Sequence, residues 1–274
     1  MKELYISDLD GTLLNNSAVV SERSAALLNR AIEEKDIYFS VATARTAATT
    51  VSLVSKINVN APVVLMNGVS IYDISKGEYV KVNVIERSAC EKAMEILSKH
   101  SLSGFWYSIR GGRLSTYYDK IQNEEARKFM NERVFRFKKI FTHVDHIEDC
   151  LRYPLVLFSL MDKKEVLEDA AEEMKKVEGL RAEFFSDTYI DGYWYLEICS
   201  SEASKSNAVK FLRSEYGFDK ITAFGDNLND IPMFKECDFS CAMENAVDEA
   251  KKYADVIIGN NDDDGVAKWI AENA

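Results

Sequence analysis

The chain has 274 residues, of which 47% are hydrophobic and 29% are charged, and this composition is typical of a globular protein with one large domain or two smaller ones. No apolar run is as long as a membrane span and no basic-then-apolar leader precedes the first strand-like segment, so we expect a cytoplasmic protein that does not bind membranes. The formal net charge of −11 and the lack of a basic block argue against a nucleic acid as partner, but they allow a small phosphorylated ligand.

The first 70 residues alternate strand-like and helix-like segments. After a strand that ends at Asp8, the pattern predicts a Ser-started helix at 21–35, a strand at 37–43, a helix at 46–56 and a strand at 61–68. Such alternation is typical of parallel strands joined by crossover helices. In sheets of this kind, ligands bind beyond the carboxyl ends of the strands.

The pattern changes in the middle of the chain, where strands follow one another through hairpins. A first hairpin covers 69–84, and the later segments predict helices at 86–100 and 162–179 and strands within 104–119, 153–161, 181–190 and 192–200. Strands joined by hairpins and covered by a few helices indicate a separate α+β unit.

From about residue 201 the first pattern returns. It predicts a helix at 203–216, a strand at 220–226, a helix after Asn229, short strands at 237–243 and 254–259, and a helix after Asp264. We therefore predict an α/β protein with a doubly wound parallel-sheet core formed by residues 1–83 and 201–274. An inserted α+β domain, residues 84–200, would interrupt this core.

Polar residues follow several predicted strands and would meet at one edge of the sheet. They are Asp8 and Asp10 after the first strand, 42–45 after the second, Asn67 and Gly68 after the third, and Asp226, Asn229 and Asp230 after the strand at 220–226; Lys205 lies in the helix after the insertion. Clustered carboxylates need a cation between them, because burying like charges side by side is unfavourable. Oxygen ligands without convincing Cys or His partners favour Mg²⁺ over zinc.

These residues resemble a known family. DLDGT (8–12), Thr43 at a strand end, Lys205 in a helix and GDNLND (225–230) resemble the four motifs of the haloacid dehalogenase (HAD) superfamily of phosphohydrolases. The Asn67-Gly68 step and NNDDDGVAKWI (260–270) resemble its Cof-type subfamily, whose C2 (type IIB) α/β cap is inserted between the second and third motifs. The resemblance covers nearly the whole chain, with Ala44 and Ser206 standing where the subfamily usually has glycine.

The resemblance implies roles for individual residues. Asp8 would be the nucleophile that forms an aspartyl-phosphate, and Asp10 would protonate the departing alcohol and then deprotonate the attacking water. Lys205 would stabilise the charge of the transferring group. The ligands of Mg²⁺ would be the Asp8 carboxylate, the Asp10 backbone carbonyl and the Asp226 carboxylate, with Asp230 orienting a metal-bound water or the lysine. The phosphoryl group would be contacted by Leu9, Thr43, Ala44, Lys205 and Asn229.

The resulting prediction is a Mg²⁺-dependent phosphatase acting on a small phosphorylated metabolite, of the sugar phosphate or phosphorylated cofactor type, as a monomer or weak dimer. Two alternatives stay open. A phosphomutase would use the same phosphoaspartate but return the group to its substrate. A non-catalytic protein would bind a phosphorylated ligand without turnover.

Overall fold

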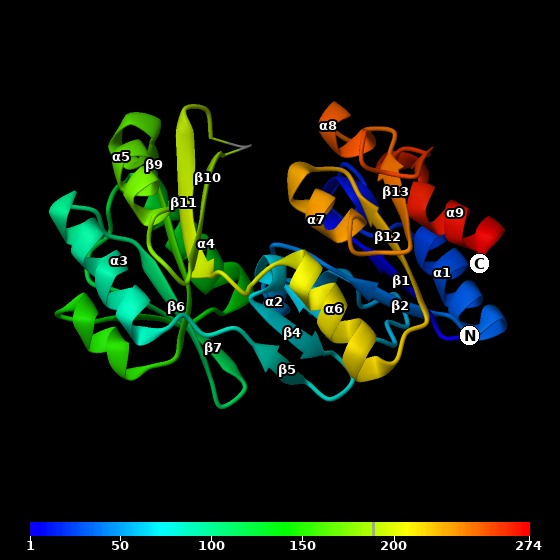
Figure 1. The fold of residues 1–274 in the computed structure, drawn as a ribbon, viewed down its shortest axis with the longest axis horizontal. Coiled ribbons are helices and arrows are strands. Elements are labelled where there is room, and N and C mark those ends of the chain that lie inside the picture. Colours follow the sequence, from blue (N-terminus) through cyan, green and yellow to red (C-terminus); the bar gives the residue numbers. More distant parts are fainter. Residues whose placement is uncertain (188–189) are drawn as a thin grey trace. The chain divides into compact units, whose positions relative to one another are not determined.

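The computed structural model describes residues 1–187 and 190–274, which form two compact units (Figure 1). The core unit comprises Met1–Lys81 and Ser204–Ala274, and the inserted unit comprises Val82–Ala203. The inserted unit therefore begins two residues before, and ends three residues after, the 84–200 segment that the sequence suggested. Each unit buries its own cluster of hydrophobic side chains.

The core unit is built on a five-stranded sheet in the order β14-β13-β12-β1-β2. Its strands are β1 (Glu3–Ser7), β2 (Tyr38–Val41), β12 (Lys220–Gly225), β13 (Phe239–Met243) and β14 (Val256–Ile258). Every pairing within this sheet is parallel, so the carboxyl ends of the strands meet at one edge. From β1 the chain adds β2 on one side of the sheet, and β12, β13 and β14 then follow on the other side. This order confirms the doubly wound fold class. The strand order reverses beside β1.

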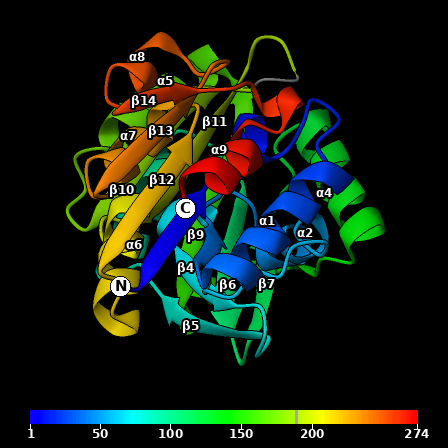
Figure 2. The same ribbon diagram turned by 90° about the vertical axis from the view of Figure 1, so that its right-hand side faces the viewer.

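Helices cover both faces of this sheet. Figure 1 shows α1 (Glu22–Lys35) and α9 (Gly265–Asn273) on one face and α6 (Lys205–Tyr216) and α7 (Ile231–Phe234) on the other. Figure 2 shows β1, β12, β13 and β14 side by side. The short helices of this unit are α2 (Ala47–Leu53) and α8 (Asp248–Lys251).

Two of these helices begin directly after a serine cap; the first start was predicted, whereas α6 begins two residues after the predicted start at residue 203. The side chain of Ser21 accepts a hydrogen bond from the backbone N–H of Ser24 at 2.9 Å, so α1 starts directly after it. Ser204 caps α6 in the same way, with the N–H of Asn207 at 3.0 Å. The second cap matters for the site, because it fixes Lys205 as the first residue of α6.

The third predicted strand is shorter than expected and leaves the parallel sheet. β3 (Val63–Leu65) pairs with β4 (Ser70–Asp73) in a three-stranded sheet that β5 (Glu78–Val82) completes, and it meets the end of β2 through a bridge between Ala42 and Val64. Met66 and Asn67 have φ angles of 51° and 52°, in the left-handed region. These two residues end the strand and turn the chain back toward β4.

The inserted unit contains a six-stranded sheet in the order β10-β11-β9-β6-β7-β8. Its strands are β6 (Phe105–Arg110), β7 (Arg113–Tyr118), β8 (Phe141–His143), β9 (Leu155–Lys163), β10 (Leu180–Ser186) and β11 (Tyr193–Ser200), and its helices are α3 (Arg87–Lys99), α4 (Glu124–Phe137) and α5 (Lys164–Met174). The sheet is antiparallel except for the parallel pair β7 and β8. The strand predicted at 181–190 corresponds to β10, and its residues 188–189 lie outside the described part of the chain.

Two further observations concern the chain as a whole. All five cysteines are free thiols, as expected for a protein without a disulfide framework. Among the residues that the structure describes, no helix has both the length and the apolar character needed to cross a membrane.

Candidate active site

The carboxyl edge of the parallel sheet carries the residues that the sequence singled out. Asp8 follows β1, Thr43 follows β2 and Asp226 follows β12. The sheet's hydrogen bonding continues up to these residues: the backbone N–H of Asp8 donates to the carbonyl of Phe224, and that of Thr43 to the carbonyl of Val64, both at 2.9 Å. The strand ends are therefore held in register where the polar side chains begin.

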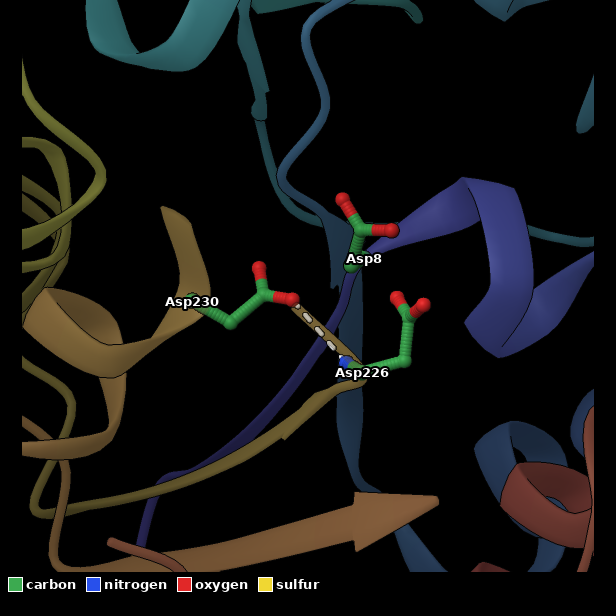
Figure 3. Close-up of side chains that lie close together, drawn as sticks. All are labelled: Asp8, Asp226 and Asp230. Atoms are coloured by element: carbon green, nitrogen blue, oxygen red, sulfur yellow. Dashed lines mark hydrogen bonds between the residues drawn. The ribbon is translucent and has the colours of Figure 1, made fainter. Parts of the chain in front are cut away.

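Three carboxylates and one ammonium form the centre of this edge. One carboxylate oxygen from each of Asp8, Asp226 and Asp230 lies within 4.8 Å of one such oxygen of each of the other two. Figure 3 shows the three side chains grouped together. The Nζ of Lys205 donates to Oδ1 of Asp8 and to Oδ1 of Asp230, both at 2.6 Å. Three negative groups thus face one positive group, which leaves two negative charges. In the described residues this is the one cluster of acidic, His or Cys side chains close enough to hold a metal ion.

Burial, first of all, and the neighbouring charges shift the pKa values of these groups. Burial raises the pKa of Asp8 well above its ordinary value, and the Asp230 and Asp226 carboxylates add to this effect while Lys205 opposes it. Burial and the Asp230 carboxylate also raise the pKa of Asp226, to about 6. Burial alone would lower the pKa of Lys205, but Asp230 and Asp8 outweigh it and hold that pKa above its usual range.

A divalent cation would satisfy this site. It would carry the two positive charges that the cluster lacks, and it would favour the ionised forms of the carboxyls that burial now disfavours. The donor atoms are oxygens, which suit a hard cation such as Mg²⁺ better than zinc. The residues present therefore fit the group that the HAD resemblance implies.

Asp230 is the most deeply buried of the three acids, and both of its oxygens are already engaged. Its side chain is 0% exposed, and its Oδ1 accepts from Lys205. Its Oδ2 accepts from the backbone N–H groups of Asp226 and Asn227, each at 3.0 Å. Asp230 therefore closes the loop between β12 and α7 and holds the Lys205 ammonium in place.

Two glycines allow the loops to approach one another closely. Gly11 has a φ of +78°, and a Cβ there would lie 2.4 Å from Oδ2 of Asp226. Gly68 has a φ of +94°, and a Cβ there would lie 2.2 Å from the backbone oxygen of Ser204. Only glycine meets both demands, because other residues carry a Cβ and avoid positive φ. Gly68 thereby lets the loop after β3 contact the start of α6, directly beside Lys205.

The residues predicted to contact a phosphoryl group lie in different surroundings. Thr43 is buried, and its hydroxyl accepts from the backbone N–H of Arg45 at 3.2 Å. The side chain of Leu9 is fully buried in the core, so only its backbone can contact a ligand. Ala44 is exposed and has no positive φ, so a side chain is accommodated where the subfamily usually has glycine. Asn229 is exposed and donates to Oδ1 of Asn67 at 3.3 Å.

Asp10 points to a different partner from the other acids. Both of its oxygens accept hydrogen bonds from the guanidinium of Arg45, at 2.7 and 2.6 Å. Its side chain is 47% exposed, in contrast to the buried Asp8. The two acids of DLDGT therefore stand in unlike environments.

Two supporting contacts were not predicted. Thr12 donates from its hydroxyl to Oδ1 of Asp226 at 2.9 Å, and Asn245 donates from its side chain to the carbonyl of Gly11 at 2.7 Å. Asn245 lies two residues after β13, so the same search for polar residues at strand ends could have found it. Thr12 belongs to DLDGT, but nothing in the sequence reveals that it contacts Asp226.

The acidic segment near the C-terminus has a structural role. Oδ1 of Asp264 accepts from the hydroxyl groups of Ser21 and Ser24, and the side chain of Asn261 donates to the carbonyl of Leu14 at 2.8 Å. These bonds tie the start of α9 to the start of α1 and to the loop that follows Asp10. The segment therefore helps to hold this loop in place.

Comparisons with known proteins identify the family. A sequence profile of the haloacid dehalogenase-like hydrolases matches residues 5–270. Two Bacillus subtilis proteins, the 5-amino-6-(5-phospho-D-ribitylamino)uracil phosphatases YcsE and YwtE, are 27% and 29% identical; the matches cover 98% and 96% of this chain and 94% and 95% of those proteins. The crystal structure of TM0651 from Thermotoga maritima superimposes with a TM-score of 0.79 at 25% identity, covering 100% of this chain and 98% of that one. The chain therefore belongs to the haloacid dehalogenase-like hydrolase family, as one of its phosphatases.

Proposed function

We propose that the chain is a Mg²⁺-dependent phosphatase that hydrolyses a small phosphomonoester through an aspartyl-phosphate on Asp8. The observation that carries the proposal is the cluster of Asp8, Asp226 and Asp230 around Lys205, with its two uncompensated negative charges. Such a cluster suits the binding of a divalent cation next to a nucleophilic carboxylate.

Three groups would hold the metal. They are the carboxylates of Asp8 and Asp226 and the backbone carbonyl of Asp10, while Asp230 holds Lys205 in place. Bound Mg²⁺ would neutralise charge, so that an anionic phosphoryl group can approach an anionic nucleophile.

In the first step, an oxygen of the Asp8 carboxylate attacks phosphorus in line with the ester oxygen. The bond between phosphorus and the ester oxygen breaks, and the protonated form of Asp10 gives its proton to the departing alcohol. This proton would occupy a lone-pair site of the carboxyl group that does not accept from Arg45. The ammonium of Lys205, already 2.6 Å from Asp8, stabilises the charge on the transferring group. The Thr43 hydroxyl, the backbone N–H groups of Leu9 and Ala44 and the Asn229 amide orient it.

In the second step, water attacks the phosphorus of the aspartyl-phosphate. Asp10, now a carboxylate, takes a proton from this water, and the bond between phosphorus and the Asp8 oxygen breaks. Inorganic phosphate leaves and the Asp8 carboxylate is restored. The half-exposed position of Asp10 supports this role, because water can reach it.

The names of two relatives support a substrate class. YcsE and YwtE are named for a phosphate ester carried on a ribityl chain. We propose that this chain also acts on a phosphomonoester of a sugar or sugar-alcohol group, with the substrate of those relatives as the first candidate to test.

The test is release of inorganic phosphate from a panel of phosphomonoesters, with Mg²⁺ and with chelator. We expect turnover that chelator abolishes, that Asp8→Asn removes, and that the control Asp36→Asn retains, because Asp36 is exposed at the end of α1 in a left-handed conformation that Asn also adopts. Turnover without a bisphosphate activator would exclude a phosphomutase. Full activity of Asp8→Asn would refute the proposal.

A further inference from the structure

The mechanism above gives no reason for the ion pair between Asp10 and Arg45. The guanidinium donates from Nε to Oδ2 of Asp10 at 2.7 Å and from Nη2 to Oδ1 at 2.6 Å. Two parallel hydrogen bonds between a planar guanidinium and a planar carboxylate fix the direction of the carboxylate as well as its position. The side chains of Asp10 and Arg45 are 47% and 28% exposed, so packing alone does not fix this carboxylate.

The backbone of Arg45 is itself held by the site. Its N–H donates to the hydroxyl of Thr43 at 3.2 Å, and its carbonyl accepts from the N–H of Met66 at 3.1 Å. The N–H of Asn67 donates to the carbonyl of Thr43 at 3.0 Å. The loop after β2 is thus anchored to the turn after β3, and it presents Thr43 and Arg45 as one unit.

From this geometry we propose that Arg45 is a positioning residue, which aims the Asp10 carboxyl group at the oxygen of the departing alcohol. The proposal rests on the proposed function, since it assigns a partner to its acid and base. Proton transfer needs a donor within hydrogen-bond distance of the leaving oxygen, and a small misplacement slows such steps strongly. Lysine cannot replace Arg45, because one ammonium does not hold both oxygens of Asp10.

Substrates with different leaving groups distinguish a positioning role of Arg45 from a general structural role. An aryl phosphate such as p-nitrophenyl phosphate releases a stable anion and needs no proton, whereas an alkyl phosphate needs one. The ratio kcat/KM covers only the steps up to release of the alcohol, so hydrolysis of the aspartyl-phosphate does not enter it. A misaligned Asp10 therefore lowers kcat/KM for the alkyl ester and spares the aryl ester.

The experiment compares wild type, Arg45→Ala and Arg45→Lys on both esters, with thermal melts to verify folding. We expect kcat/KM for the alkyl phosphate to fall about tenfold to a hundredfold in both variants, and for p-nitrophenyl phosphate about threefold at most. Asp10→Asn should show the same contrast, and adding Arg45→Ala to it should cause no further loss. Arg30→Ala, which removes an exposed partner of Glu34 in the same unit, is the matched control and should change neither value.

Two outcomes would overturn this inference and leave the proposed function standing. Equal losses on the two esters would assign Arg45 to phosphate binding or to folding, and unchanged rates on both would make the ion pair incidental. If Arg45→Ala does not fold, Arg45→Lys carries the comparison. Wild-type protein that releases no phosphate from either ester would refute the proposed function, and this inference with it.

Discussion

Replacing Lys205 by methionine removes the ammonium while keeping most of the side-chain volume. The Lys205 side chain is 1% exposed, and its partners Asp8 and Asp230 are 8% and 0% exposed. The substitution therefore leaves two carboxylates buried together without the cation that contacts both. Breaking a buried ion pair by removing one partner is strongly destabilising, by about 3–5 kcal/mol.

Protonation limits the size of this effect. The variant can avoid two adjacent buried charges if one carboxyl group keeps its proton. Keeping a carboxyl protonated costs about 1.4 kcal/mol for each pH unit above its ordinary pKa. At pH 7, roughly three units above that pKa, the cost is about 4 kcal/mol. Part of this cost is present in the wild type, where burial already raises the pKa of Asp8. We therefore expect Lys205→Met to lower the free energy of unfolding by about 3 kcal/mol at pH 7 without metal.

The loss of stability in Lys205→Met should depend on pH with a definite sign. A carboxyl whose pKa is raised in the folded state stabilises the fold at low pH, and this contribution is lost as the pH rises through the raised value. The deficit of Lys205→Met should therefore shrink by about 1 kcal/mol for each pH unit from 7 toward 5.

The assay is urea unfolding in chelator between pH 5 and 8. The control is Lys210→Met on the same helix, where a 57% exposed lysine lies 3.3 Å from Glu236 and should contribute about 0.5 kcal/mol or less. Free energies of unfolding that agree within about 1 kcal/mol for the two variants at pH 7, or a loss of stability that does not change with pH, would refute this prediction.

Three further predictions concern other parts of the structure. Burial and the facing Glu183 raise the pKa of Glu197 to about 7. Glu197→Gln should therefore stabilise the protein by about 2 kcal/mol at pH 8 and hardly at pH 5. Equal gains in stability at the two pH values would show that the ionisation of Glu197 is not the cause. Gly68→Ala, whose Cβ would lie 2.2 Å from the backbone of Ser204, should lower the free energy of unfolding by about 3 kcal/mol or more. Gly77→Ala is the control and should cost about 1 kcal/mol, because the nearest atom to its Cβ would be 3.8 Å away. Similar melting temperatures for the two variants would contradict the close approach at Gly68. Because Mg²⁺ needs ionised ligands and the pKa of Asp226 is about 6, Mg²⁺ should raise the melting temperature more at pH 7.5 than at pH 5.5, and shifts of the same size would count against Asp226 as a ligand.

The sequence predicted those features that depend on local pattern. Alternation of strands and helices gave the parallel sheet, and this in turn predicted that Asp8 and Asp226 would meet at one edge, as they do. The serine before α1 marked where that helix begins, whereas α6 begins at Lys205, after the Ser204 cap, and not at the predicted residue 203. These predictions held because the periodicity of apolar residues and the capping chemistry act within a few residues of chain.

Features that depend on tertiary contacts escaped prediction. Helix α4 was not predicted, although Ala126, Phe129, Met130 and Phe137 recur at helical spacing, and only Ala126 of this helix is buried. β3 ends early because Met66 and Asn67 both take left-handed conformations; Asn favours this region, but methionine does not, so residue 66 gave no sign of it. The pairing of Arg45 with Asp10 joins residues 35 positions apart, and only the folded sheet edge brings them together.

The most direct test of the proposed mechanism is to locate the phosphoryl group on the protein during turnover. Asp10→Asn, mixed with excess p-nitrophenyl phosphate and Mg²⁺ and quenched in acid, should carry the mass of one phosphoryl group on the peptide that contains Asp8, because the second step has lost its base. The same peptide from Asp8→Asn/Asp10→Asn should be unmodified. A burst of p-nitrophenol with no phosphoryl group on Asp8 would contradict the account.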